Sequence, residues 1–129
     1  WHHEADLYMV PTEDLSAPID SVEQYKMKVV NTDDTESFHN WSSNSRWMVF
    51  SSRRIDGLFT RLYFSHIDEN GQETKPFLLP QKNPRRYYNE LFMSYNVPDF
   101  ITAPVKFDNL RAEEIIAAPE RKQMGVRKL

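Results

Sequence analysis

Two adjacent arginines beside two serines are the side chains in this sequence most suited to binding chemistry. Ser51-Ser52-Arg53-Arg54 combines hydroxyl groups with two guanidinium groups, and this combination suits a carboxylate or a phosphate ligand. The same residues have a second interpretation, in which the Arg53 guanidinium bonds backbone carbonyls and Asp56 and only holds a loop in place. In that case Arg53 is structural, and Arg54 is the residue more available to a ligand.

The acidic and histidine residues give weaker signs of a metal site. His2-His3-Glu4 could begin a zinc site, but adjacent residues on a strand face opposite ways and no second cluster follows at ligand spacing. The acidic residues 33, 34 and 36 lack the Asp-x-Asp-x-Asp-Gly order that wraps a calcium ion. We therefore expect a solvated turn at 31–36 and no metal.

Motifs of the common catalytic centres do not occur in the sequence. It has no Gly-x-Ser-x-Gly, no His-Glu-x-x-His and no phosphate-binding glycine loop, and it contains only three glycines. It also has no cysteine, which excludes disulfides, thiolate metal sites and cysteine nucleophiles. We therefore expect neither an enzyme nor a cofactor.

Composition narrows the class of partner. The 129 residues suit one domain, and a hydrophobic content of 40% can supply a core of ordinary size. The net charge of −3 comes from interspersed acids and bases, so the basic face that nucleic-acid binding requires is not expected. No apolar run approaches the roughly 20 residues that span a bilayer, so we expect no transmembrane segment. Because the chain begins with Trp1, we expect further sequence upstream.

The elements that must position these residues are mostly short strands. Runs of β-formers separated by turn residues predict strands at 5–10, 25–30, 47–50, 60–67 and 75–79. The turns between them are predicted at 43–45, where Asn44 takes the left-handed conformation, and at Asp56-Gly57 and Asn70-Gly71.

One of these strands has two apolar faces. Trp47 and Val49 should point to one side, and Met48 and Phe50 to the other. A strand with no polar face has to lie between two layers, so residues 47–50 are predicted to be interior.

The last third of the sequence changes to helical spacing. Asn83 followed by Pro84 is a helix start, and aromatic and apolar residues recur at helical spacing, which predicts an amphipathic helix over 84–95 that docks on the sheet. Asp108 or Asn109 is predicted to cap a second helix that ends before Pro119.

The segment from Trp41 to Phe64 resembles the repeat of TolB-like (WD40-like, PD40) β-propellers. That repeat has an aromatic-Ser pair, a turn, an apolar strand, Ser-x-Arg, an Asp-Gly turn and a Leu-Tyr strand. The matching positions are Trp41, Ser42, Arg46, Trp47, Phe50, Arg53, Asp56, Gly57 and Tyr63. The turn Ser43-Asn44-Ser45 departs from the usual Pro-Asp-Gly, which is a small change of turn chemistry. Because position 53 belongs to the repeat itself, the resemblance favours the structural interpretation of Arg53.

The resemblance implies a mainly β fold that is part of a propeller. About one and a half four-stranded antiparallel blades would be followed by a short helical tail: half a blade with its connection at 1–36, a complete blade at 37–82 and the tail at 83–129. His39 would pack on or bond to the neighbouring blade. Without further blades, residues 47–50 would have open apolar faces, so we expect association with the missing upstream blades or self-association.

Three functions remain open at this point. The resemblance implies a periplasmic, non-catalytic scaffold that binds other proteins, with Arg54, Arg53, His39 and Asp56 as candidate binding residues. Alternatively, the chain is the propeller segment of a larger enzyme or cytochrome-maturation protein whose active domain lies upstream. A carbohydrate-binding domain using Trp1, Trp41 and Trp47 ranks last, because the surroundings of Trp47 are predicted to be buried.

Overall fold

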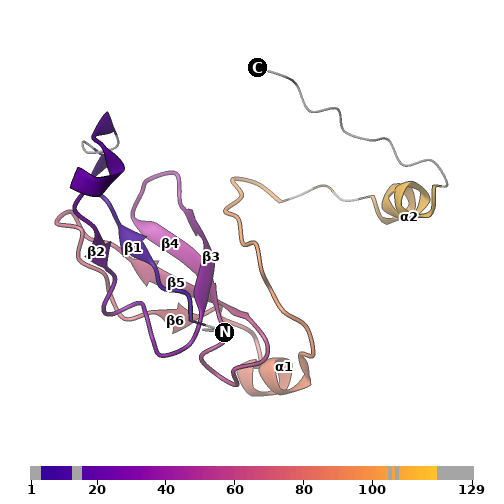
Figure 1. Cartoon of the computed structure of the whole chain (residues 1–129). Helices are drawn as coiled ribbons and strands as arrows, with labels where there is room; N and C mark the ends of the chain where they lie inside the picture. Colours follow the sequence, from indigo (N-terminus) through magenta and orange to yellow (C-terminus); the bar gives the residue numbers. More distant parts are fainter. Residues whose placement is uncertain (1–3, 13–15, 105, 107, 119–129) are drawn as a thin grey trace.

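A four-stranded antiparallel sheet is the centre of the structure, a computed structural model that describes residues 4–12, 16–104, 106 and 108–118 (Figure 1). Each strand pairs with the next along the chain, in the order β3-β4-β5-β6. The strands are β3 (Glu36–Trp41), β4 (Trp47–Ser52), β5 (Arg61–His66) and β6 (Phe77–Leu78). The predicted mainly β, antiparallel architecture is confirmed.

Strand β4 is interior, as its two apolar faces required. Met48, Val49 and Phe50 are buried, and so are Ser51 and Ser52 after them. Trp47 is the exception, because it begins the strand at the edge of the molecule and keeps 37% of its surface exposed.

The turns of the sheet use short polar side chains and glycine. Gly57 and Gly71 have φ angles of +67° and +74°, a region that glycine enters without strain. In the β3–β4 turn the left-handed residue is Ser45 and not Asn44, so that prediction is wrong. The Asn44 side chain instead accepts hydrogen bonds from the Ser42 hydroxyl and the Arg46 N–H, which requires it to stay over the turn.

A second, two-stranded sheet packs on one face of the first. It consists of β1 (Tyr8–Met9) and β2 (Tyr25–Lys26), and a short 3₁₀ turn, η2 (Ile19–Ser21), lies in their connection. Both strands are shorter than the predicted 5–10 and 25–30, because residues 28–30 form a turn. The Asn31 side chain closes that turn by bonding both the N–H and the carbonyl of Leu7, at 2.9 Å each.

The hydrophobic core lies between these two sheets. The amino-terminal layer, which contains β1 and β2, supplies Leu7, Met27 and Val30. The four-stranded sheet supplies side chains from β4, from β5 and from just after β5: Met48, Phe50, Tyr63 and Ile67. The Phe50 and Tyr63 rings stack at 5.9 Å between centroids. One apolar face of β4 is thus covered by the chain's own amino-terminal residues.

The predicted helical tail is only partly helical. Helix α1 (Pro84–Glu90) begins as predicted, with Asn83 accepting a hydrogen bond from the Arg86 N–H, but it ends at Glu90, not at 95. Helix α2 (Asn109–Ala117) is capped by Asp108, whose carboxylate accepts hydrogen bonds from the N–H groups of Leu110 and Arg111. In the described part of the chain, α2 contacts no strand, and no helix is long and apolar enough to cross a membrane.

Residues 91–100, between the two helices, cover the opposite face of the four-stranded sheet. We call this segment the strap. The Phe100 ring lies 6.1 Å from the Phe64 ring, edge to face, and Pro98 is buried. The expectation that β4 would keep open apolar faces is therefore wrong, because the chain supplies a cover for each face.

Residue Met27 provides a test of the amino-terminal layer. Met27 is 1% exposed and its neighbour Val29 is 50% exposed. We expect Met27→Ala to lower the free energy of unfolding by about 2–5 kcal/mol, because a cavity is left in the core. The matched Val29→Ala should cost less than about 0.5 kcal/mol. Urea unfolding of both variants measures the difference, and equal losses would mean that residues 5–30 do not form part of the core.

Candidate functional site

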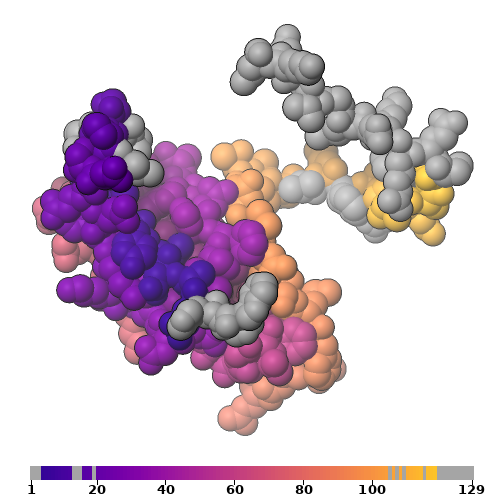
Figure 2. All heavy atoms as spheres, viewed as in Figure 1, coloured from indigo at the N-terminus to yellow at the C-terminus, as the bar shows by residue number. Residues whose placement is uncertain are grey.

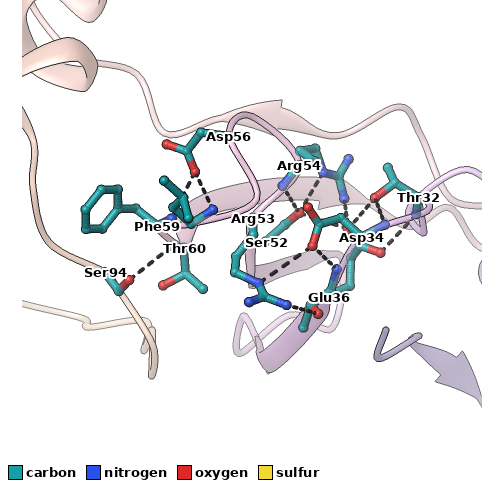
Figure 3. Close-up of polar contacts among 12 residues, drawn as sticks. Thr32, Asp34, Glu36, Ser52, Arg53, Arg54, Asp56, Phe59, Thr60 and Ser94 are labelled. Carbon is teal, nitrogen blue, oxygen red and sulfur yellow. Dashed lines mark hydrogen bonds and ion pairs between the residues drawn. The ribbon is translucent and has the colours of Figure 1, made fainter. Parts of the chain in front are cut away.

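A buried carboxylate, Glu36, joins the start of β3 to the end of β4 (Figure 3). Glu36 is 1% exposed. Its oxygens accept hydrogen bonds from the Ser52 hydroxyl at 2.8 Å and from the Arg54 guanidinium at 3.0 Å. The N–H and hydroxyl of Thr32 donate to it at 2.9 and 2.8 Å. Water does not reach this carboxylate, so its oxygens are met by these four hydrogen-bond donors, and the Arg54 guanidinium supplies the opposite charge.

The Arg54 side chain is the most enclosed of the two adjacent arginines. Besides Glu36, it donates to the Val30 carbonyl at 2.7 Å and to the Ser52 hydroxyl at 2.9 Å. Its guanidinium carbon also lies 4.5 Å from the centroid of the Tyr63 ring, a cation–π distance. The prediction that Arg54 is the more available of the two arginines is wrong, since its side chain is 16% exposed and that of Arg53 is 27% exposed.

Residue Arg53 lies in the same cluster but has other partners than predicted. It donates to the Thr35 hydroxyl at 2.7 Å, and its Nε lies 3.6 Å from the Asp34 carboxylate. Asp56, the predicted partner, pairs with Arg61 at 3.4 Å. The predicted structural role of Arg53 fits this geometry, while its expected partner is wrong, because the loop at 53–60 turns Asp56 away toward β5.

Residue Arg61 is a buried charge that the sequence analysis missed. It is 2% exposed at the first position of β5. One terminal nitrogen reaches Asp56 and the carbonyl of Leu91 at 3.2 Å, and the other reaches the carbonyl of Met93 at 3.3 Å. An arginine beginning a strand gives no sign of burial in the sequence, because its partners come from residues about thirty positions later.

Residue Asp56 combines a turn with this ion pair. Its carboxylate accepts from the N–H groups of Leu58 and Phe59, at 2.9 Å each. Desolvation alone would raise the pKa of Asp56, but the two N–H donors and the Arg61 guanidinium outweigh it and hold the pKa below its usual value. The carboxylate is therefore charged in the folded protein at neutral pH.

The other predicted site residues do not come together. His39 is exposed on β3, beside Phe38, which has a φ of +48° at a bulge in the β3–β4 ladder. Its contact with a neighbouring blade stays a prediction. Glu36 and Asp34 serve Arg54 and Arg53, and no three His, Asp or Glu side chains in the described ranges could hold a metal ion. His2 and His3 lie outside the described residues.

The remaining residues of the repeat pattern close the β3–β4 hairpin and the core. The Ser42 hydroxyl accepts from the Trp47 N–H at 3.0 Å, and Arg46 pairs with Glu69 at 2.7 Å across the neighbouring turn. Trp41 is opposite Met48 in the β3–β4 ladder, so it lies on the face opposite to Trp47. The two tryptophans cannot form one stacking platform for a sugar ring, and Trp1 lies outside the described residues.

Both edges of the four-stranded sheet are protected from strand addition. On β3, the Ala5 carbonyl accepts the Glu36 N–H at 2.8 Å and the Asn40 side chain accepts the Trp41 N–H at 2.7 Å. On the other side β6 is two residues long, and Pro76 and Pro80 lie close to its two ends. The exposed side chains of β3 are Phe38, at 54%, His39 and Trp41.

Comparison of the chain with models of known protein families, with curated proteins and with solved structures finds no match. Its function therefore has to be inferred from the geometry above. Among the described residues, the charged groups around Glu36 and Arg54 are bonded to one another, to the Ser52 hydroxyl and to the backbone. The large hydrophobic side chains that are exposed on β3 are Phe38 and Trp41.

The Glu36–Arg54 pair can be tested with a double-mutant cycle. We expect Glu36→Gln and Arg54→Met each to lower the free energy of unfolding by roughly 3 kcal/mol, because each leaves the other group buried without its partner. The coupling energy should exceed about 1 kcal/mol, whereas the same cycle on the exposed Arg86–Glu90 pair should give roughly 0.3–0.5 kcal/mol. Urea unfolding measures both cycles, and equal coupling in the two would contradict a structural role of the buried pair.

The Asp56 carboxylate predicts a pH dependence of stability. Because its pKa is lower in the folded state, its contribution is fully present above about pH 4 and is lost as the pH falls through the folded pKa. Asp56→Asn keeps an oxygen for the two N–H donors but loses the charge facing Arg61. The gap in urea midpoint between the natural chain and this variant should therefore shrink from pH 6 to pH 2. A gap that is constant across this range would show that the charge contributes nothing.

Proposed function

We propose that the chain is part of a TolB-like β-propeller, contributing one blade and half of the blade before it, and that it acts as a non-catalytic, protein-binding scaffold in the periplasm. The observation that carries this proposal is the four-stranded antiparallel sheet with β4 in its interior and the two-stranded sheet β1–β2 packed on one of its faces. A four-stranded antiparallel meander whose strands follow one another in sequence is the form of a propeller blade.

The amino-terminal sheet supports the same proposal. Successive blades pack face to face, and β1 and β2 lie with their core residues Leu7 and Met27 against the face of the next sheet (Figure 1). A half blade preceding a whole one would have this position. The residue pattern at 41–63 points to the TolB-like group among propellers, and from that group comes the periplasmic location.

A binding role suits the distribution of polar and aromatic groups. The carboxylates and guanidiniums drawn in Figure 3 are engaged with one another or with the backbone, so they hold loops in place. The aromatic side chains of Phe38 and Trp41 are exposed on β3, and aromatic residues are enriched where proteins bind one another. We therefore assign the binding surface to β3 around the bulge at Phe38.

Site-specific photo-crosslinking tests this assignment in the cell. A benzophenone amino acid is placed at Phe38 or Trp41 in the gene expressed in its own host, with exposed Leu58 in the 53–60 loop as the matched control. We expect the two β3 positions to crosslink a defined envelope protein in the periplasmic fraction, at several times the yield at Leu58. Yields at 38 and 41 no higher than at 58 would rule out a protein-binding surface on β3.

A further inference from the structure

The strap is bound as an extended peptide on a prepared surface. Residues 91–100 form no helix or strand, yet they lie along the sheet from the start of β5, at Arg61, to the end of β3, at Asn40. Figure 2 shows the orange carboxy-terminal segment lying against the magenta residues of the sheet. The question is what holds a segment that has no regular structure of its own.

The sheet recognises the backbone of the strap. The Ser51 hydroxyl donates to the Tyr95 carbonyl at 2.7 Å, and Arg61 donates to the carbonyls of Leu91 and Met93. The Tyr95 N–H in turn donates to the Thr60 carbonyl at 3.2 Å. Side chains of the strap take part as well, because Ser94 and Asn96 accept hydrogen bonds from Thr60 and Asp99 accepts one from Asn40.

The receptor side of this contact is buried and the strap side is not. Ser51, Thr60 and Arg61 are all buried. In contrast, Phe92 is 80% exposed, and Val97 is exposed as well. Pro98 and the Phe100 ring are the side chains that the strap inserts. The surface beneath the strap is thus a binding site that is occupied by a segment of the same chain.

The connection to the strap is weakly attached to the rest of the molecule. It runs from Pro80 through helix α1, which has no buried residue. Among the described contacts, the Tyr88 hydroxyl bonds the Leu79 carbonyl at 2.6 Å. Helix α1 and the strap can therefore leave the sheet together without opening the core between the two sheets.

We propose that the strap of a second copy of this chain occupies the site in trans, which gives a strap-exchanged dimer. Every bond between strap and sheet is available in trans as well as in cis, so exchange loses none of them. The exposed apolar side chains of the strap, including Phe92 and Val97, add surface that a dimer can bury and a single chain cannot. This proposal rests on the strap contacts and not on the propeller assignment.

Disulfide exchange between single-cysteine variants tests the proposal, because the chain has no cysteine of its own. The Asn40 side chain on β3 donates to the Asp99 carboxylate on the strap at 2.7 Å, so the two positions are in contact. Asn40→Cys is mixed with a mass-tagged Asp99→Cys under mild oxidation. We expect a disulfide-linked dimer of one chain of each kind, formed at least several-fold faster than from Ser43→Cys, in the exposed β3–β4 turn, mixed with the same Asp99→Cys.

The double variant Asn40→Cys/Asp99→Cys makes the result decisive. If it forms an internal disulfide in a monomer while the mixed single variants crosslink no faster than the Ser43 control, the strap binds only in cis and the proposal is overturned. If the double variant forms no disulfide of either kind, strap and sheet are not in contact and the proposal is overturned too. Neither result depends on an envelope partner, so the crosslinking test at Phe38 and Trp41 can succeed or fail separately.

Discussion

Strand β4 has no polar face, and the rest of the structure follows from the need to cover both of its sides. Met48 and Phe50 point into a core that Leu7, Met27 and Val30 complete. Val49 and Ser51 point the other way, where the strap lies. Burying a Val, Met or Phe side chain stabilises the fold by about 1.5–3 kcal/mol, so a layer on each side contributes more than any surface ion pair. The chain is therefore built as a sheet with a different cover on each face.

The layers that cover the sheet also bury charged groups near the end of β4. These groups are therefore bonded to one another and to the backbone. Glu36, Arg54 and Arg61 are placed where apolar layers close over them. A buried charge is costly unless most of its hydrogen-bonding groups are met. Here the Glu36 carboxylate has four donors, and the terminal nitrogens of Arg61 reach carbonyl and carboxylate acceptors, although its Nε has no hydrogen-bond partner. The serines and arginines at the end of β4, which first suggested an anion site, therefore hold the loop at 31–35, β3 and β4 together.

The blunted edges of the sheet decide how the chain can meet other molecules. With the outward N–H groups of Glu36 and Trp41 already bonded, a further strand cannot extend the sheet there. Contacts must then use side chains, such as the aromatic surface of β3, or replace one of the two covers. The strap is the more replaceable cover, because it is held largely by hydrogen bonds and, of its residues, Pro98 is the buried one.

Much of the local structure was determined by the sequence itself. The period-two pattern, the Asp-Gly and Asn-Gly turns and the Asn83 and Asp108 caps correctly predicted four antiparallel strands, the interior position of residues 48–50 and the starts of both helices. These features depend on residues close together in the chain. Only the tertiary structure decided that Arg54 is more enclosed than Arg53, that Arg61 is buried, and that α1 ends at Glu90 so that the residues after it can extend over the sheet. Each of these depends on partners about twenty or more residues away, and the burial of a charge depends on such partners being brought close by packing, which no local pattern encodes.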